Sequence, residues 1–148
     1  MFPINFIEML QLGFGKPVLE LAAEQGAGVL AIKPMCRGSW PEGVERTRKW
    51  WYRPVEEARE VALALRFTLS QPGVVAGFPP AFVDLLDKAI EAAQAYRAIT
   101  EGTVELGKIA KECISVFRKE EAEVARGMPP RRAIYPGSPR EGCPGIHV

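Results

Sequence analysis

The chain has 148 residues, of which 47% are hydrophobic and 25% are charged, a composition typical of one globular domain with a real core. Its 19 basic and 18 acidic residues give a net charge of only +1, which excludes a strong overall attraction to nucleic acid, to an anionic membrane or to an acidic partner. No apolar run approaches the roughly 20 residues of a membrane span, and the N-terminal residues lack the features of a secretory leader, so we predict a cytoplasmic protein.

The first half of the chain alternates strand and helix signals. Residues 2–7 are apolar and aromatic-rich, which predicts a strand. Residues 17–25 begin with a proline, carry apolar side chains at helical spacing and precede Gly26, which predicts a helix. Residues 28–35 are an almost continuous apolar run, typical of a parallel strand that is covered on both faces. Residues 36–53 show no clear periodicity and predict a long loop.

The second half repeats this alternation. Uninterrupted helical spacing of apolar residues over 54–69 predicts a helix. Residues 74–78 follow a turn and predict a short strand, and the helical spacing over 82–93 predicts the helix after it. A last helix is predicted from Thr100, as its cap, to Phe117, although two glycines inside this segment weaken it.

The order of strands and helices predicts an α/β fold, in which right-handed crossovers join parallel strands. Three strands leave two bare sheet edges, and a fourth forms only if residues 96–99 or 133–135 pair. A complete (β/α)8 barrel needs eight strands, so we expect residues 1–118 to be a piece of a larger closed sheet, followed by an extended or disordered tail over 119–148. Because bare edges invite pairing, we predict self-association, in which two four-stranded chains can close one barrel, or assembly with a complementing N-terminal barrel segment.

Several sequence blocks together carry a resemblance to a known family. They cover residues 2–6, 28–35, 48–54, 64–74, 76–80 and 98–117. In their order and spacing they resemble consecutive blocks of the aldo/keto reductase family. The resemblance implies a partial (β/α)8 TIM barrel, made of the last three strand-helix units and a C-terminal helix. It also implies an oxidoreductase that binds NADPH or NADH and transfers hydride to a small carbonyl substrate.

The catalytic tetrad of that family, an Asp, a Tyr, a Lys and a His, lies on the earlier strands of the barrel. The single histidine of this chain, His147, lies in its tail, so the tetrad has no counterpart here. The resemblance therefore implies no catalytic residue in this chain. We expect the chain alone to be inactive, with the catalytic half encoded upstream, supplied by another chain or lost.

The resemblance also implies a cofactor site in the loops that follow the last two strands. This site consists of Lys33, Pro34, Met35, Gly77, Phe78, Pro79 and Pro80. Barrel enzymes hold their sites at these carboxyl ends of strands. Lys33 can also be a solvated or ion-paired lysine, and Pro34 only a strand terminator. The chain has Ile32 where family members stack an aromatic ring on the nicotinamide, and Leu86 where they carry an arginine. No clamp for a 2′-phosphate is visible, so the choice between NADPH and NADH stays open.

Other functions are also compatible with parts of the sequence. Residues 46–53 interleave cations with aromatic rings, a pattern that can bind single-stranded nucleic acid. The nearby carboxylates of Glu42 and Glu45 and the almost neutral chain favour instead a loop that packs over the site. A further alternative is a non-catalytic half-barrel that binds a nucleotide, or a protein partner through its sheet edges. The three cysteines are too far apart for a zinc site or an iron–sulfur cluster, and we predict free thiols and no metal.

Overall fold

The computed structural model describes residues 1–99, 103–118 and 126. The chain divides into two compact units, Met1–Val116 and Phe117–Val148. Within the described residues, five helices and three strands lie in the first unit. The tail predicted over 119–148 lies, apart from Arg126, outside the described residues.

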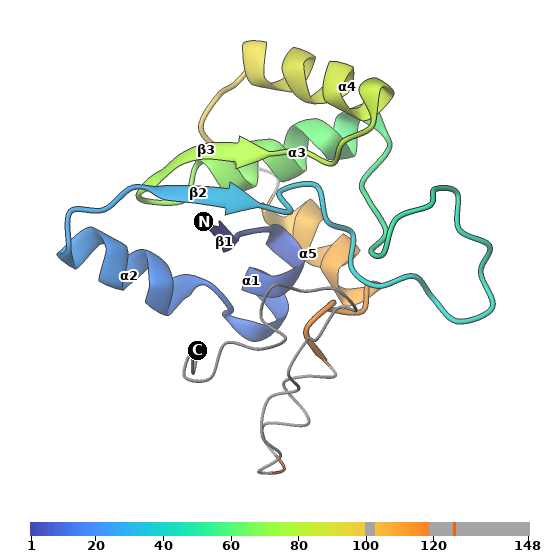
Figure 1. Ribbon diagram of the computed structural model, residues 1–148, viewed down its shortest axis with the longest axis horizontal. Coiled ribbons are helices and arrows are strands. Elements are labelled where there is room, and N and C mark those ends of the chain that lie inside the picture. Colours follow the sequence, from blue (N-terminus) through green and yellow to red (C-terminus); the bar gives the residue numbers. More distant parts are fainter. Residues whose placement is uncertain (100–102, 119–125, 127–148) are drawn as a thin grey trace, which may run out of the picture. The chain divides into compact units, whose positions relative to one another are not determined.

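The three strands form one small parallel sheet (Figure 1). The strands are β1 (Phe2–Pro3), β2 (Val29–Ile32) and β3 (Val74–Phe78), in the order β1-β2-β3. All pairings are parallel. The predicted α/β fold with parallel strands is thus confirmed, and in the described part of the chain β1 and β3 are the edges of the sheet. Three strands and five helices are compatible with a partial barrel.

The predicted strand over residues 2–7 is wrong beyond its first residues. Only Phe2–Pro3 pairs with β2, and helix α1 (Phe6–Leu12) begins four residues into the prediction. Asn5 caps this helix, because its side-chain oxygen accepts a hydrogen bond from the backbone N–H of Glu8 at 3.1 Å. Gly13 ends it in the left-handed conformation, with φ 63°. The cap thus outweighs the strand preference of the aromatic and β-branched residues.

The other predicted helices are present, with shifted ends. Their bounds are α2 (Lys16–Glu24), α3 (Ala58–Leu69), α4 (Val83–Gln94) and α5 (Thr103–Lys111). Helix α3 begins later than predicted because Pro54 pairs with Cys36 in an isolated antiparallel bridge and Val55 donates its N–H to the carbonyl of Met35 at 2.8 Å. Helix α5 ends before Phe117, and its predicted cap, Thr100, lies outside the described residues. Residues 96–99, one of the two candidates for a fourth strand, form no strand. The other candidate, 133–135, is not described.

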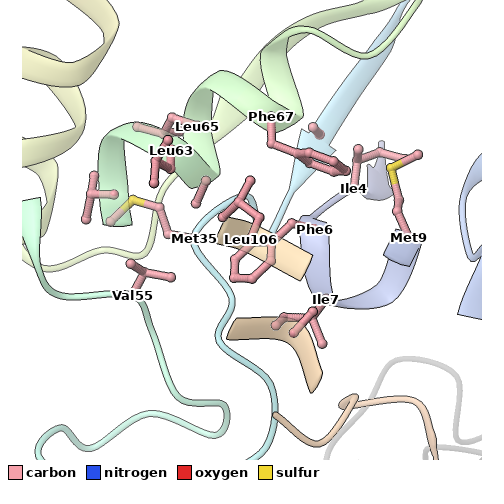
Figure 2. Packing of buried hydrophobic residues seen from close by; sticks show 14 of the residues in the cluster. Ile4, Phe6, Ile7, Met9, Met35, Val55, Leu63, Leu65, Phe67 and Leu106 are labelled. Atoms are coloured by element: carbon pink, nitrogen blue, oxygen red, sulfur yellow. The ribbon is translucent and has the colours of Figure 1, made fainter. Parts of the chain in front are cut away.

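The hydrophobic core lies between the sheet and helices α1, α3 and α5 (Figure 2). Fully buried side chains include Ile4, Phe6, Ile7, Val61 and Leu106. Alternate residues of β2 face this core, since Val29 and Ala31 are buried whereas Leu30 and Ile32 are only half-buried. Phe78 is in register with Ile32 and is 47% exposed. The core therefore covers one face of the sheet, and the described residues cover the other face only in part.

Candidate functional site

A pocket of about 280 Å³ opens at the carboxyl ends of β2 and β3. Because these two strands are parallel and adjacent, their last residues and the loops after them meet at one edge of the sheet. The residues that line the pocket are Ile32, Lys33, Trp50, Trp51, Tyr52, Phe78, Pro79, Pro80 and Ala81. The pocket thus brings together four of the residues predicted for the cofactor site, namely Lys33, Phe78, Pro79 and Pro80.

The remaining predicted site residues lie elsewhere. Pro34 and Met35 are fully buried, and Met35 points into the core beside Val55 and Leu63 (Figure 2). Gly77 lies at the face of the sheet that packs on α3, since a Cβ added to it would lie 3.6 Å from both Leu69 and Pro34. Pro34 and Met35 therefore hold the end of β2 in place, and they do not line the pocket.

Lys33 turns the chain at the end of β2. Its φ of 60° is the only left-handed value at a non-glycine residue among those described. The side-chain nitrogen of Lys33 lies 5.2 Å from the ring centroid of Trp51, within range of a cation–π interaction. Burial lowers the pKa of Lys33, while electrostatic interactions with Cys36 and Glu8 act in the opposite direction. The pocket thus contains one partly desolvated amine beside an aromatic ring.

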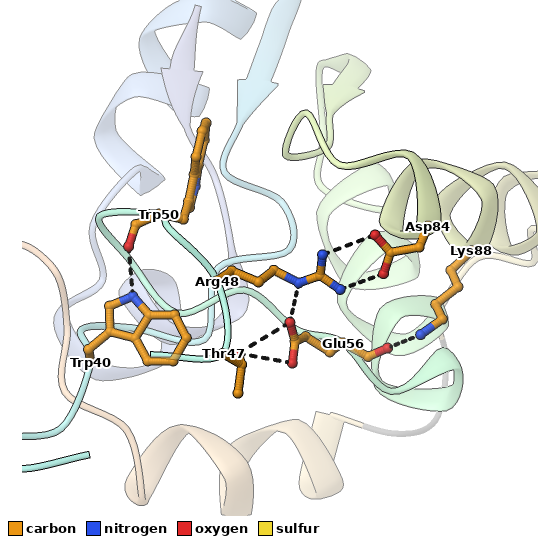
Figure 3. A network of polar contacts seen from close by, with 7 residues as sticks. All are labelled: Trp40, Thr47, Arg48, Trp50, Glu56, Asp84 and Lys88. Atoms are coloured by element: carbon orange, nitrogen blue, oxygen red, sulfur yellow. Dashed lines mark hydrogen bonds and ion pairs between the residues drawn. The ribbon is translucent and has the colours of Figure 1, made fainter. Parts of the chain in front are cut away.

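Three consecutive aromatic residues of the 36–53 loop form a wall of the pocket. Trp50 and Trp51 each make an edge-to-face contact with Tyr52, with ring centroids 5.9 and 5.0 Å apart. Trp50 also contacts Phe82 at 5.4 Å, and its carbonyl accepts a hydrogen bond from the indole N–H of Trp40 at 2.9 Å (Figure 3). Tyr52 is 3% exposed, and burial raises the pKa of its hydroxyl to about 12, so it stays neutral.

Arg48 fastens the same loop to two other elements (Figure 3). Its guanidinium pairs with Glu56, just before α3, and with Asp84 in the first turn of α4. The hydrogen bonds to Arg48 hold the pKa of the Asp84 carboxyl below its ordinary value. Lys88 donates to the backbone carbonyl of Glu56 at 2.7 Å. The predicted long loop over 36–53 is confirmed as irregular, and these contacts pack part of it against the carboxyl end of the sheet.

A second pocket, also of about 280 Å³, has a different character. It lies between α3, α4 and β3 and is lined by Leu65, Leu69, Gly77, Pro79, Leu86, Ala89, Ile90 and Ala93. These residues present no polar side chain, so this pocket favours apolar groups. It includes Leu86 of α4.

Glu8 is a buried carboxylate that sequence reasoning did not single out. It is fully buried on α1 and accepts hydrogen bonds from the hydroxyl of Ser115 and, at 3.1 Å, from the backbone N–H of Val116. Burial raises the pKa of Glu8, and both hydrogen bonds and the charge of Lys33 oppose this shift. The spacing of Asn5 and Glu8 is that of a capping box, which predicts the start of a helix. It does not predict that Glu8 contacts Ser115 and Val116.

Replacing Glu8 with glutamine should change how stability depends on pH. An acid whose pKa is higher in the folded than in the unfolded chain holds more protons when folded, so its contribution to stability falls as pH rises through the folded pKa. Glutamine cannot ionise, so Glu8→Gln should gain stability relative to the unmodified chain as the pH rises from the ordinary carboxylate range to neutrality. Urea unfolding at a series of pH values measures this difference.

The control for this experiment is Glu20→Gln, at an exposed position of α2. It should follow the pH profile of the unmodified chain. A constant difference between Glu8→Gln and the unmodified chain at every pH would contradict a raised pKa at Glu8.

Two further findings concern the described residues as a whole. No cluster of three or more His, Cys, Asp or Glu side chains suited to a metal ion occurs among them. None of the described helices combines the length and the hydropathy needed to cross a bilayer.

Comparisons with protein-family models, with curated proteins and with solved structures found no match to this chain.

Proposed function

We propose that the pocket at the ends of β2 and β3 binds part of a nicotinamide nucleotide, NADPH or NADH, in an oxidoreductase of the aldo/keto reductase type. The observation that carries the proposal is that Lys33, Phe78, Pro79 and Pro80, which come from two separate strand ends, line one pocket. In this proposal the chain supplies a cofactor-binding portion, and a complementing barrel segment supplies the tetrad that reduces a small carbonyl compound.

The chemistry of the pocket suits an anionic ligand with a flat ring. The Lys33 ammonium can neutralise a phosphate, and the ring of Trp51, which is 55% exposed, can stack on a base. Pro79, Pro80 and Ala81 lead into the N-terminus of α4, the end of a helix dipole that favours anions. Asp84 lies in that first turn, but its charge is paired with Arg48.

The size of the pocket limits what it can hold. About 280 Å³ is slightly below the range for small-molecule sites, roughly 300–1,000 Å³. A whole dinucleotide is larger than this. The proposal therefore assigns the pocket to one portion of the cofactor, with the remaining contacts on the complementing segment.

The engagement of Arg48 also bears on the nucleic-acid alternative. Its two ion pairs remove one cation of the basic and aromatic segment from those that could meet a phosphate backbone.

The alternative of a protein partner at a sheet edge rests on a different observation. The strand β3 lies at an edge of the described sheet, and Val75 on it is 65% exposed.

Tryptophan fluorescence tests the proposed nucleotide site directly, because Trp50 and Trp51 line it. NADPH and NADH should each change the emission in a saturable manner, with the weak affinity expected of an incomplete site. Lys33→Gln should weaken the affinity about tenfold or more, since losing one charged contact to a phosphate costs about 1.5–3 kcal/mol.

Two controls make this titration decisive. Lys16→Gln removes an equal charge at an exposed position of α2 and should leave the affinity unchanged. N-acetyltryptophanamide, titrated in parallel, corrects for light absorbed by the nucleotide. A linear response that matches this correction up to millimolar nucleotide would remove the proposed function.

A further inference from the structure

In the pocket at the ends of β2 and β3, a single amine has largely apolar surroundings, which nucleotide binding does not require. Lys33 is the only residue with an amine among those that line it, and the other walls are aliphatic or aromatic, with the neutral Tyr52 hydroxyl. The left-handed backbone at Lys33 turns the chain sharply there, while Pro34 and Met35 run into the core. A primary amine thus stands at the end of a strand whose next two residues are buried, in a largely apolar pocket.

The geometry points to Lys33 as a nucleophile that condenses reversibly with a small aromatic aldehyde held in this pocket. The lone pair of the neutral amine attacks the carbonyl carbon, a C–N bond forms, and the carbonyl oxygen takes up a proton to give a carbinolamine. Loss of the oxygen as water and of a proton from nitrogen then gives the imine. This reactivity is independent of the proposed cofactor role.

The surroundings favour this reaction in three ways. Burial lowers the pKa of Lys33, which increases the neutral, nucleophilic fraction of the amine. The acidic groups that act on it electrostatically are Glu8, on α1, and Cys36, in the following loop. Burial raises the pKa of both, that of Cys36 to about 12, so the Cys36 thiol stays neutral and Glu8 is less readily ionised than an exposed carboxylate.

The walls of the pocket also suit the proposed ligand class. The Lys33 nitrogen lies over the Trp51 ring, 5.2 Å from its centroid, so an aromatic ring packed against the edge of the indole brings its aldehyde group close to the amine. The volume of about 280 Å³ is enough for a molecule with one ring.

Reductive trapping in the native protein tests the inference. The chain is incubated with benzaldehyde and sodium cyanoborohydride, whose hydride converts the imine to a stable secondary amine, and peptide mass spectrometry gives the labelling rate at each lysine. Lys33 should be labelled several-fold faster than the exposed Lys16 and Lys49, although both are more accessible. Lys88, which is half-buried and hydrogen-bonded to Glu56, should be labelled most slowly.

Two comparisons separate the fold from the local sequence. In concentrated urea the preference for Lys33 should disappear, because it depends on the assembled pocket. Lys33→Arg, which retains the charge, should lose only this adduct, whereas Lys16→Arg should keep it. Labelling of Lys33 at or below the rate of Lys16 in the native chain would overturn the inference.

The outcome is independent of the cofactor experiment, since trapping is carried out without nucleotide. A failed NADPH titration with preferential labelling of Lys33 leaves the reactive amine standing and removes only the proposed function. Saturable NADPH binding without preferential labelling supports the proposed function and removes the reactive amine.

Discussion

Replacing Gly38 with alanine should lower the free energy of unfolding by about 2–4 kcal/mol. Gly38 has φ 84°, where an L-residue costs about 1–2 kcal/mol. A Cβ at this position would also lie 2.3 Å from the backbone oxygen of Ile114, far inside van der Waals contact. To relieve the clash, the chain must move the segment that accepts a hydrogen bond from the N–H of Ser39 at 2.7 Å, which costs about 1 kcal/mol more.

Gly43→Ala is the matched control for this substitution. Gly43 lies in the same loop with φ 74°, and a Cβ there meets nothing within 4 Å. It should therefore show the backbone cost of about 1–2 kcal/mol without the clash. Urea unfolding followed by circular dichroism gives both values. Equal losses for the two variants would mean that the loop and the segment at Ile114 are not packed as described.

Much of the fold could be predicted from local pattern, because the pattern and the three-dimensional environment agree. The apolar run that contains β2 and the uninterrupted periodicity of α3 each match an element that the core covers. Residues 2–7 show where this agreement ends. Their composition favours a strand, but Asn5 accepts a hydrogen bond from the N–H of Glu8 in the first turn of a helix, and four of the residues from Phe6 onward are buried there.

Some features of the candidate site could likewise be predicted from the sequence, and others could not. Lys33 and Phe78 could be placed near each other because neighbouring parallel strands end at the same edge. The burial of Met35 could not, since it depends on the left-handed turn at Lys33, a conformation that residue type does not predict for lysine. The partners of Glu8 lie more than 100 residues away, so no local pattern contains them.

The last described helix provides the other large expected effect. Leu106 on α5 is fully buried, with 0% exposure to solvent. It belongs to the core cluster that includes Phe6 and Ile7 of α1 (Figure 2). Helix α5 is further held to α1 by Gln11, whose side-chain amide donates to the carbonyl of Cys113 at 2.8 Å, just beyond the end of the helix. The core should therefore depend on α5 as much as on the helices before it.

Leu106→Ala should accordingly lower the free energy of unfolding by about 2–5 kcal/mol, the usual cost of truncating a buried leucine and leaving a cavity. Val104→Ala is the matched control, because Val104 lies on the same helix and is 76% exposed, so its loss should stay within about 0.5 kcal/mol. Urea unfolding measures both. If both variants lost the same small amount, α5 would not be part of the core in solution, and the tie between Glu8 and the segment after α5 would lose its structural basis, because that segment is positioned by the packing of this helix.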